Sequence, residues 1–129
     1  MPSGSLVHSS ETGIKGEEIA LGYLKKNGFK LLEQNWRTRR GEVDLITEKD
    51  KGLYFVEVKF RRTLGFGRGE EAVNLSKQKK MALAALDYIQ KKVAHQRAIH
   101  FAALVIDGSQ DPQRVEWIEF PLDLPLQYY

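Results

Sequence analysis

Residues 52–60, GLYFVEVKF, have the alternation of a β-strand and an abrupt change of character at its end. Alternate residues would give one continuous apolar face, made of Tyr54, Val56, Val58 and Phe60. The opposite face starts apolar at Leu53 but turns polar with Glu57 and Lys59. Because an unpaired charge inside a core is strongly disfavoured, this change predicts a polar site at the end of the strand.

The length and composition are those of one globular domain. The 129 residues are 42% hydrophobic and 29% charged, which is enough for a core without cross-links. There is no cysteine, so a metal would need oxygen or imidazole ligands. No apolar run approaches the ~18 residues of a membrane span, and the opening residues lack the apolar centre of a secretory signal. We therefore expect a cytoplasmic protein without a membrane partner.

Charge is distributed unevenly along the chain. The formal net charge is +3, with lysine and arginine concentrated between residues 57 and 100 and acids dominating after Asp107. This distribution fits either ordinary solvated faces or a basic surface for phosphate backbones. We expect a flexible tail at residues 1–12, a nuclease-like domain at residues 13–120, and a second tail at residues 121–129, which covers the sheet edge or serves self-association.

Hydrophobic periodicity and turn residues predict seven elements in the order αβββαββ. The expected helices cover residues 13–27, after Thr12 as N-cap, and residues 75–94. The expected strands cover residues 29–37, 42–47, 53–61, 99–107 and 115–120. The apolar face of the second helix would carry Leu75, Ala82, Leu86, Ile89 and Val93. A hairpin followed by a helical crossover predicts an α/β fold with a mixed β-sheet flanked by helices.

The short turn between the second and third strands restricts how they pair. If residues 50 and 51 form the turn, Asp44 faces Glu57 across the ladder. If residues 51 and 52 form it, Asp44 faces Lys59. Either register places all three side chains on one face, where opposed Cβ atoms lie ~4.5–5.5 Å apart. Two carboxylates at that separation repel each other unless a divalent cation or a lysine neutralises them.

The chemistry that suits this set is metal-assisted phosphodiester hydrolysis. Carboxylate oxygens suit Mg²⁺ or Mn²⁺, which polarises a scissile phosphate and lowers the pKa of a bound water. Lys59 would orient or deprotonate that water, or stabilise charge on phosphorus. Glu17 falls in the apolar stripe of the first helix and would complete or support the metal shell. The alternative interpretation is a salt-bridged cross-strand group, with Glu17 simply an acid near a helix start.

Four segments, GIKGEEIALGYL, NWRTRRGEVDLI, FVEVKFRR and SKQKKMALAALDYI, form a combined pattern over about residues 13–106. This pattern resembles the PD-(D/E)xK nuclease superfamily and, more narrowly, the YraN family of bacterial proteins. The resemblance implies a restriction-endonuclease-like fold, akin to archaeal Holliday-junction resolvases. It also implies functional positions, at Glu17, Asp44, Glu57 and Lys59, with the three acids as metal ligands.

The same resemblance bears on nucleic-acid contacts. Lys77 matches a lysine near the start of the second long helix, where it would contact phosphate. The expected phosphate-binding residues are Arg61, Arg62, Lys77 and Lys80, which would hold the backbone without reading its sequence. Trp36, beside several arginines, would either stack a base or belong to the core. Family members tend to carry an acid in the HFAALVI strand, where this chain has Ala102, so a partner behind the metal ligands is expected to be missing.

These observations predict a metal-dependent endonuclease that hydrolyses DNA, of branched or otherwise structured form, with Mg²⁺ or Mn²⁺ as cofactor. One alternative is a non-catalytic nucleic-acid-binding module that keeps the fold. Another is a scaffolding protein in which the polar cluster is only a salt-bridged group. Because resolvase-like nucleases commonly act as dimers, the resemblance also implies a homodimer.

Overall fold

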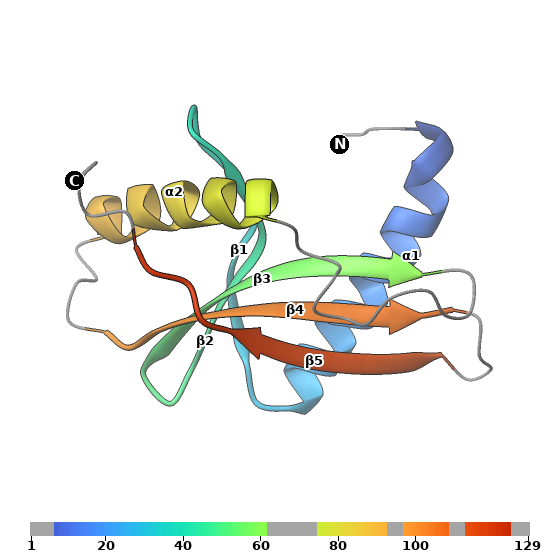
Figure 1. Cartoon of the computed structure of the whole chain (residues 1–129). Helices are drawn as coiled ribbons and strands as arrows, with labels where there is room; N and C mark the ends of the chain where they lie inside the picture. The colour runs from blue at the N-terminus through green and yellow to red at the C-terminus, as the bar shows by residue number, and fades with distance from the viewer. Residues whose placement is uncertain (1–6, 62–74, 93–96, 109–112, 125–129) are drawn as a thin grey trace.

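A computed structural model describes residues 7–61, 75–92, 97–108 and 113–124, with residues 7–15 as backbone only. Its elements are α1 (Val7–Lys26), β1 (Lys30–Arg37), β2 (Glu42–Lys49), β3 (Gly52–Arg61), α2 (Leu75–Lys92), β4 (Ile99–Asp107) and β5 (Arg114–Phe120). The strands form one five-stranded sheet in the order β1-β2-β3-β4-β5 (Figure 1). Only β3 and β4 pair in parallel, and the other neighbours are antiparallel. The predicted mixed sheet and the order αβββαββ are confirmed.

The two helices cover opposite faces of the sheet (Figure 1). Ile46 of β2 belongs to a buried cluster with Tyr88 of α2. Its neighbour Leu45 belongs to a second cluster with Ala20 and Leu24 of α1. Because successive residues of a strand point to opposite faces, these two clusters form separate layers on the two sides of one sheet.

The β2–β3 hairpin turns at Asp50 and Lys51, whose φ angles of 50° and 69° are both left-handed. Two consecutive left-handed residues form the two-residue turn whose twist matches that of the flanking strands. Lys49 pairs with Gly52, and the ladder continues to Leu45 opposite Val56. The structure therefore has the first of the two predicted registers, in which Asp44 comes next opposite Glu57.

The β1–β2 hairpin twists strongly at Asn35, which has a φ of 56°. Gln34 points to the α1 side, where it bonds to Glu17, whereas the Trp36 indole donates to the Ala84 carbonyl of α2 at 3.1 Å. In a regular strand, residues 34 and 36 would share one face. The left-handed residue between them turns the end of the hairpin toward α2, as Figure 1 shows.

Two predictions about the helices are wrong. α1 begins at Val7, so Thr12 lies inside the helix rather than at its N-cap. No proline or glycine separates Val7 from Thr12, so nothing in the sequence stops the helix there. Leu75, predicted on the apolar face of α2, is 82% exposed because it is the first residue of the helix, before α2 meets the sheet. Val93 lies outside the described residues.

In the part of the chain that the structure describes, neither helix has the length and apolarity to span a membrane.

Candidate functional site

The candidate site lies where β2 separates from β3. Their backbone pairing runs from Lys49–Gly52 to Leu45–Val56. One residue further, the Asp44 carboxylate reaches across and accepts the N–H of Val58 at 2.8 Å. A hydrogen bond from the backbone of β3 to a side chain of β2 thus replaces the backbone pairing of the two strands at this point. This contact directs the Asp44 carboxylate toward β3, as the hairpin argument required.

Glu57 is the buried member of the site, with only 5% of its surface exposed. It follows Val56 on β3 and lies on the face that α2 covers. Its Oε2 atom accepts a hydrogen bond from Nζ of Lys77, in the first turn of α2, at 2.5 Å. A buried carboxylate needs such a partner, because an unpaired charge in this environment is destabilising by several kcal/mol. Lys77 therefore anchors the start of α2 over the end of β3.

The electrostatics identify a local excess of negative charge. Burial, and then the nearby charge of Glu57, raise the pKa of Asp44 from 3.8 to about 7, although the Val58 hydrogen bond and Lys77 act in the opposite direction. Burial alone would lower the pKa of Lys77, but its bond to Glu57 and the charges of Glu57 and Asp44 outweigh burial and raise it. Among the described residues, Lys77 is the cation that lowers the pKa of Asp44, whereas the charges of Glu57 and Glu42 both raise it. A further cation would relieve their repulsion.

The donor set fits a hard divalent cation such as Mg²⁺ or Mn²⁺. Each carboxylate has about four lone-pair sites, so the bonds from Val58 and Lys77 leave acceptor capacity on Asp44 and Glu57. Among the described residues, no three acids or histidines gather closely enough to hold a metal. Two carboxylates completed by waters and phosphate oxygens are a usual magnesium arrangement. The residues present therefore fit such an ion, with water supplying the remaining ligands.

Glu17 does not join this pair. It lies on α1, partly buried, where its Oε1 atom accepts a hydrogen bond from the side-chain amide of Gln34 at 3.0 Å. The bond with Gln34 gives Glu17 a polar partner, which an acid on the apolar stripe of a helix needs. The role of Glu17 as a metal ligand stays a prediction.

The predicted cations have different surroundings. Lys59 is exposed and lies two residues beyond Glu57, with its side chain on the same face by strand alternation. Lys80 is exposed and Arg61 is partly buried. Arg62 lies outside the described residues.

Sequence reasoning missed that Lys77 is the ion-pair partner of Glu57. It required a lysine or a metal near the two carboxylates but assigned Lys77 to phosphate. The available signal was the crossover itself, since a helix following β3 and covering its Glu57 face brings its first turn over that strand.

Ala102, a position at which the resemblance leads us to expect an acid, is fully buried in β4. It pairs with Val56, whereas Ala103 pairs with Glu57. Because Ala103 packs in the α2-side cluster, its neighbour Ala102 points to the α1 side. The departure therefore leaves the α2-side surroundings of the acid pair unchanged.

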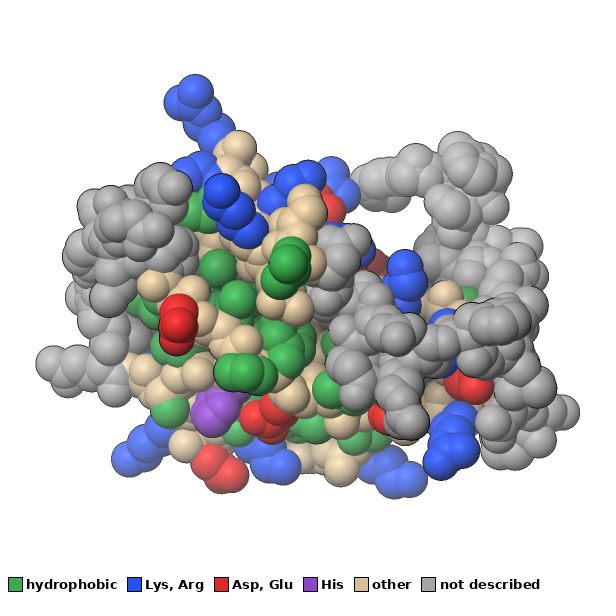
Figure 2. Space-filling view, in the orientation of Figure 1, with side chains coloured by type: hydrophobic (Ala, Val, Ile, Leu, Met, Phe, Trp, Pro, Cys, Tyr) green, Lys and Arg blue, Asp and Glu red, His purple; other side chains and the backbone are tan. Residues whose placement is uncertain are grey.

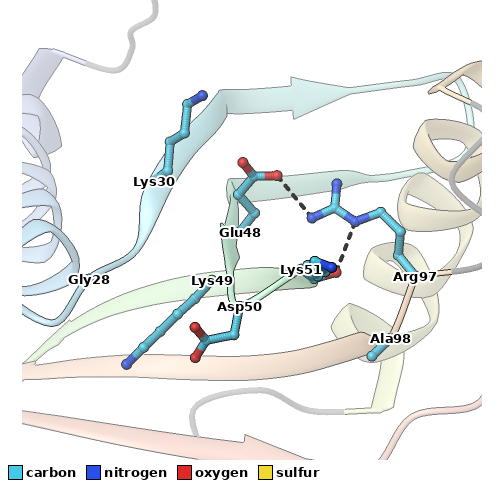
Figure 3. Close-up of a pocket in the computed structure, with 8 residues that line it drawn as sticks. All are labelled: Gly28, Lys30, Glu48, Lys49, Asp50, Lys51, Arg97 and Ala98. Atoms are coloured by element: carbon cyan, nitrogen blue, oxygen red, sulfur yellow. Dashed lines mark hydrogen bonds and ion pairs between the residues drawn. The ribbon is translucent and has the colours of Figure 1, made fainter.

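A cavity of about 650 Å³ lies at the opposite end of the hairpin, beside the β2–β3 turn (Figure 3). The Arg97 guanidinium there is engaged by Glu48 at 2.9 Å and by the Lys51 carbonyl at 3.0 Å. Figure 3 shows the side chains of Lys30 and Lys49 pointing in opposite directions. The polar groups that line this cavity do not converge on one point, so the cavity is a weaker candidate for the functional site than the acid pair.

The fold and the acid pair together define an α/β protein with a two-carboxylate site at the separation of two strands. A family model described as "Uncharacterised protein family UPF0102" matches residues 16–110. The chain belongs to this family, which confirms the narrower resemblance found in the sequence.

Similar proteins support this assignment across most of the chain. A UPF0102 protein of Rhodococcus opacus is 39% identical over 108 residues, covering 84% of this chain and 92% of its own. One of Syntrophomonas wolfei is 46% identical over 101 residues, covering 76% and 88%. One of Geobacter sulfurreducens is 36% identical over 126 residues, covering 96% and 98%.

Proposed function

We propose that this protein is a metal-dependent endonuclease that hydrolyses phosphodiester bonds in DNA. The observation that carries the proposal is the Asp44–Glu57 pair, two adjacent and largely buried carboxylates that share one lysine. Structural ion pairs usually balance their charges, whereas perturbed and unbalanced carboxylates are typical of sites that bind a cation. The resemblance to PD-(D/E)xK nucleases supports the same assignment.

The proposed roles follow from the position of each side chain. Asp44 and Glu57 would hold Mg²⁺ or Mn²⁺. Glu17 is a further proposed ligand, which would have to leave the side-chain amide of Gln34 to reach the ion. The bound ion would supply Lewis-acid polarisation of the phosphate and a water of lowered pKa. Lys77 holds Glu57 in its orientation through their hydrogen bond. Lys59, at the exposed edge of the same face, would contact the phosphate and the attacking water.

The proposed substrate is DNA of branched or structured form, and both parts of this proposal rest on the resemblance. Arg61, Arg62 and Lys80 would contact phosphates near the site, which predicts binding that weakens steeply with added salt. A homodimer is proposed on the same ground, and light scattering of the purified protein tests it.

Nuclease assays with matched variants test the proposal. The purified protein is incubated with duplex, single-stranded and four-way branched DNA in Mn²⁺, in Mg²⁺, and in EDTA. We expect metal-dependent cleavage that Glu57→Gln abolishes and that Lys59→Ala lowers at least tenfold. Glu116→Gln, an exposed acid on β5, is the control and should cut normally. Absence of metal-dependent cleavage on all substrates, or full activity in Glu57→Gln, would refute a nuclease.

The second candidate is a nucleic-acid-binding module that keeps the fold without the chemistry. One observation favours it: the Lys77 ammonium already neutralises the Glu57 carboxylate through a direct ion pair. This candidate predicts DNA binding that Glu57→Gln leaves unchanged and no cleavage under any metal condition. The assays above therefore separate the two functions.

A further inference from the structure

A second polar surface lies between the β1–β2 turn and α2. Its lining residues are Trp36, Arg37, Thr38, Arg39, Arg40, Asp87 and Lys91, and they form an open depression of about 680 Å³. We call this surface the Trp36 groove. Its size lies within the range of small-ligand sites. Four of its side chains are cationic and one is acidic. Figure 2 shows lysine and arginine side chains gathered where this turn and α2 lie.

The Trp36 ring is held in a fixed orientation. Its indole N–H donates to the Ala84 carbonyl at 3.1 Å, and its ring meets Tyr88 edge-on, with centroids 5.2 Å apart. The Lys91 ammonium lies over the ring, 5.6 Å from its centroid. Lys91 is exposed and its side chain is flexible, so another flat group can replace it over the ring. Trp36 is partly buried and packs against the α2-side core, as one of the two alternatives for this residue predicted. The part of its ring under Lys91 is therefore a fixed aromatic surface whose covering side chain can be displaced.

The cations around this aromatic surface differ in how tightly they are held. Arg40 is braced by Asp87 at 2.5 Å. The Thr38 hydroxyl accepts the backbone N–H groups of Arg40 and Gly41 at 3.1 Å and 3.2 Å, which fixes the turn. Arg39, which lies between Thr38 and Arg40 in this turn, is exposed. A rigid turn that presents an exposed guanidinium is suited to a phosphate, which arginine binds with two parallel hydrogen bonds.

The groove and the acid pair are connected through α2 and the β1–β2 turn. Gly41 packs against the Lys80 backbone, which is one helical turn from Lys77. Arg40 precedes Asp44 by four residues, a span of at most ~13 Å in an extended chain.

We propose that the Trp36 groove binds an unpaired segment of polynucleotide, with one base on Trp36 and the adjoining phosphates on Arg39 and Lys91. Duplex bases are stacked on each other, so only an unpaired base offers its face to an aromatic ring. The approach of this segment to Asp44 and Glu57 rests on the proposed nuclease function. Binding in the groove itself needs neither metal nor cleavage.

Tryptophan fluorescence gives a direct test, because the chain has only two tryptophans. In a Trp117→Phe background, Trp36 is the remaining emitter. Titration with a twelve-residue oligodeoxythymidylate in EDTA should quench it, since a stacked base lies against the indole. The matching duplex and a polyglutamate of equal charge should give at most a tenth of this quenching at the same concentration.

Substitutions on the groove complete the test with labelled oligodeoxythymidylate and anisotropy. We expect Arg39→Ala and Lys91→Glu each to weaken binding about three- to tenfold at low salt and to flatten its salt dependence. Trp36→Leu should weaken it roughly five- to 150-fold, and circular dichroism checks its folding. Lys26→Ala, an exposed lysine on α1, should bind normally.

The outcomes separate this inference from the nuclease proposal. Unaltered binding in both Arg39→Ala and Lys91→Glu, or equal quenching by duplex or polyglutamate, overturns the groove assignment, whatever the cleavage result. Conversely, binding that depends on these residues in a protein that never cuts supports the groove and overturns only the nuclease. Since neither groove substitution replaces a core residue, a folding defect does not obscure the result.

Discussion

Gly41 lies so close to α2 that a side-chain carbon on it would be 2.0 Å from the Lys80 carbonyl oxygen. This contact holds the β1–β2 turn against the helix. The same contact connects the acid pair with the Trp36 groove. Lys77 of this helix bonds to Glu57, and Trp36 of this hairpin bonds to Ala84 of the helix.

Gly41→Ala is therefore expected to destabilise the protein by about 2–4 kcal/mol, because the clashing atoms are backbone and cannot rotate away. Denaturant unfolding measures this loss. Gly22→Ala is the matched control, since nothing lies within 4 Å of the added carbon and the site is helical. The control should gain up to about 1 kcal/mol. Equal stability of the two variants would contradict the contact.

Asp44→Asn is expected to stabilise the protein at pH 8. The unfolded chain loses this proton near the ordinary pKa of 3.8, whereas the folded protein keeps it up to about 7. Stability is therefore lost as pH rises between these two values, and the cost is complete above the second. The shift sets a ceiling of about 4 kcal/mol, and we expect a gain of about 2 kcal/mol from urea unfolding, because asparagine still accepts the Val58 N–H. The gain should shrink toward zero near pH 4.

Asp87→Asn serves as the opposite case for the same measurement. Although burial acts to raise the pKa of Asp87, hydrogen bonds from Arg40 and Thr38 outweigh it and lower the pKa. Its ionised form thus stabilises the fold above the ordinary pKa, and that contribution disappears in acid. The substitution should lower stability at pH 8. If both substitutions changed the free energy of unfolding in the same direction at pH 8, the inferred excess of negative charge around Asp44 would be contradicted.

Mn²⁺ should raise the thermal unfolding midpoint at pH 8. A ligand at a hundred times its dissociation constant stabilises a fold by about 2.7 kcal/mol, which is several degrees for a domain of this size. The effect should be smaller at pH 5, where Asp44 is protonated and must release its proton. Glu57→Gln should abolish it, and Glu116→Gln should retain it. Calorimetric titration that found no Mn²⁺ uptake would exclude the metal site.

Lys77→Met should destabilise the protein by about 1–2 kcal/mol, because it leaves Glu57 without its ammonium partner. The full cost of breaking a buried pair is reduced here, since 41% of the Lys77 side chain is exposed. Adding Glu57→Gln should recover much of the loss, so a double-mutant cycle by chemical denaturation reports the coupling. Additive losses would show that the pair is not energetically linked.

The fold was largely predictable because its signals are local. Period-two alternation located β3, and the short turn at Asp50 limited the ladder to two registers, one of which the structure has. The facing of Asp44 and Glu57 followed from that ladder. It did not require knowledge of any distant contact.

Other features depend on contacts between distant segments. Which lysine would pair with Glu57 depended on where the helix after β3 begins, and sequence periodicity does not determine the docking of a helix end. The facing of Gln34 toward Glu17 depended on the register shift in β1 between Leu31 and Glu33, and the opposite facing of Trp36 depended on the left-handed Asn35. Local propensity revealed neither feature. The boundary of α1 was missed because a good capping residue at Thr12 does not prevent a helix from starting earlier.

Asn35 has a consequence beyond its own strand. By reversing the alternation of β1, this one residue lets a short hairpin attach to both layers of the molecule, with Gln34 reaching one helix and Trp36 the other. A residue that resists positive φ here, such as valine, would force a choice between the two attachments. Asparagine tolerates this left-handed angle better than most residues, so glycine and aspartate are the replacements expected to preserve both attachments.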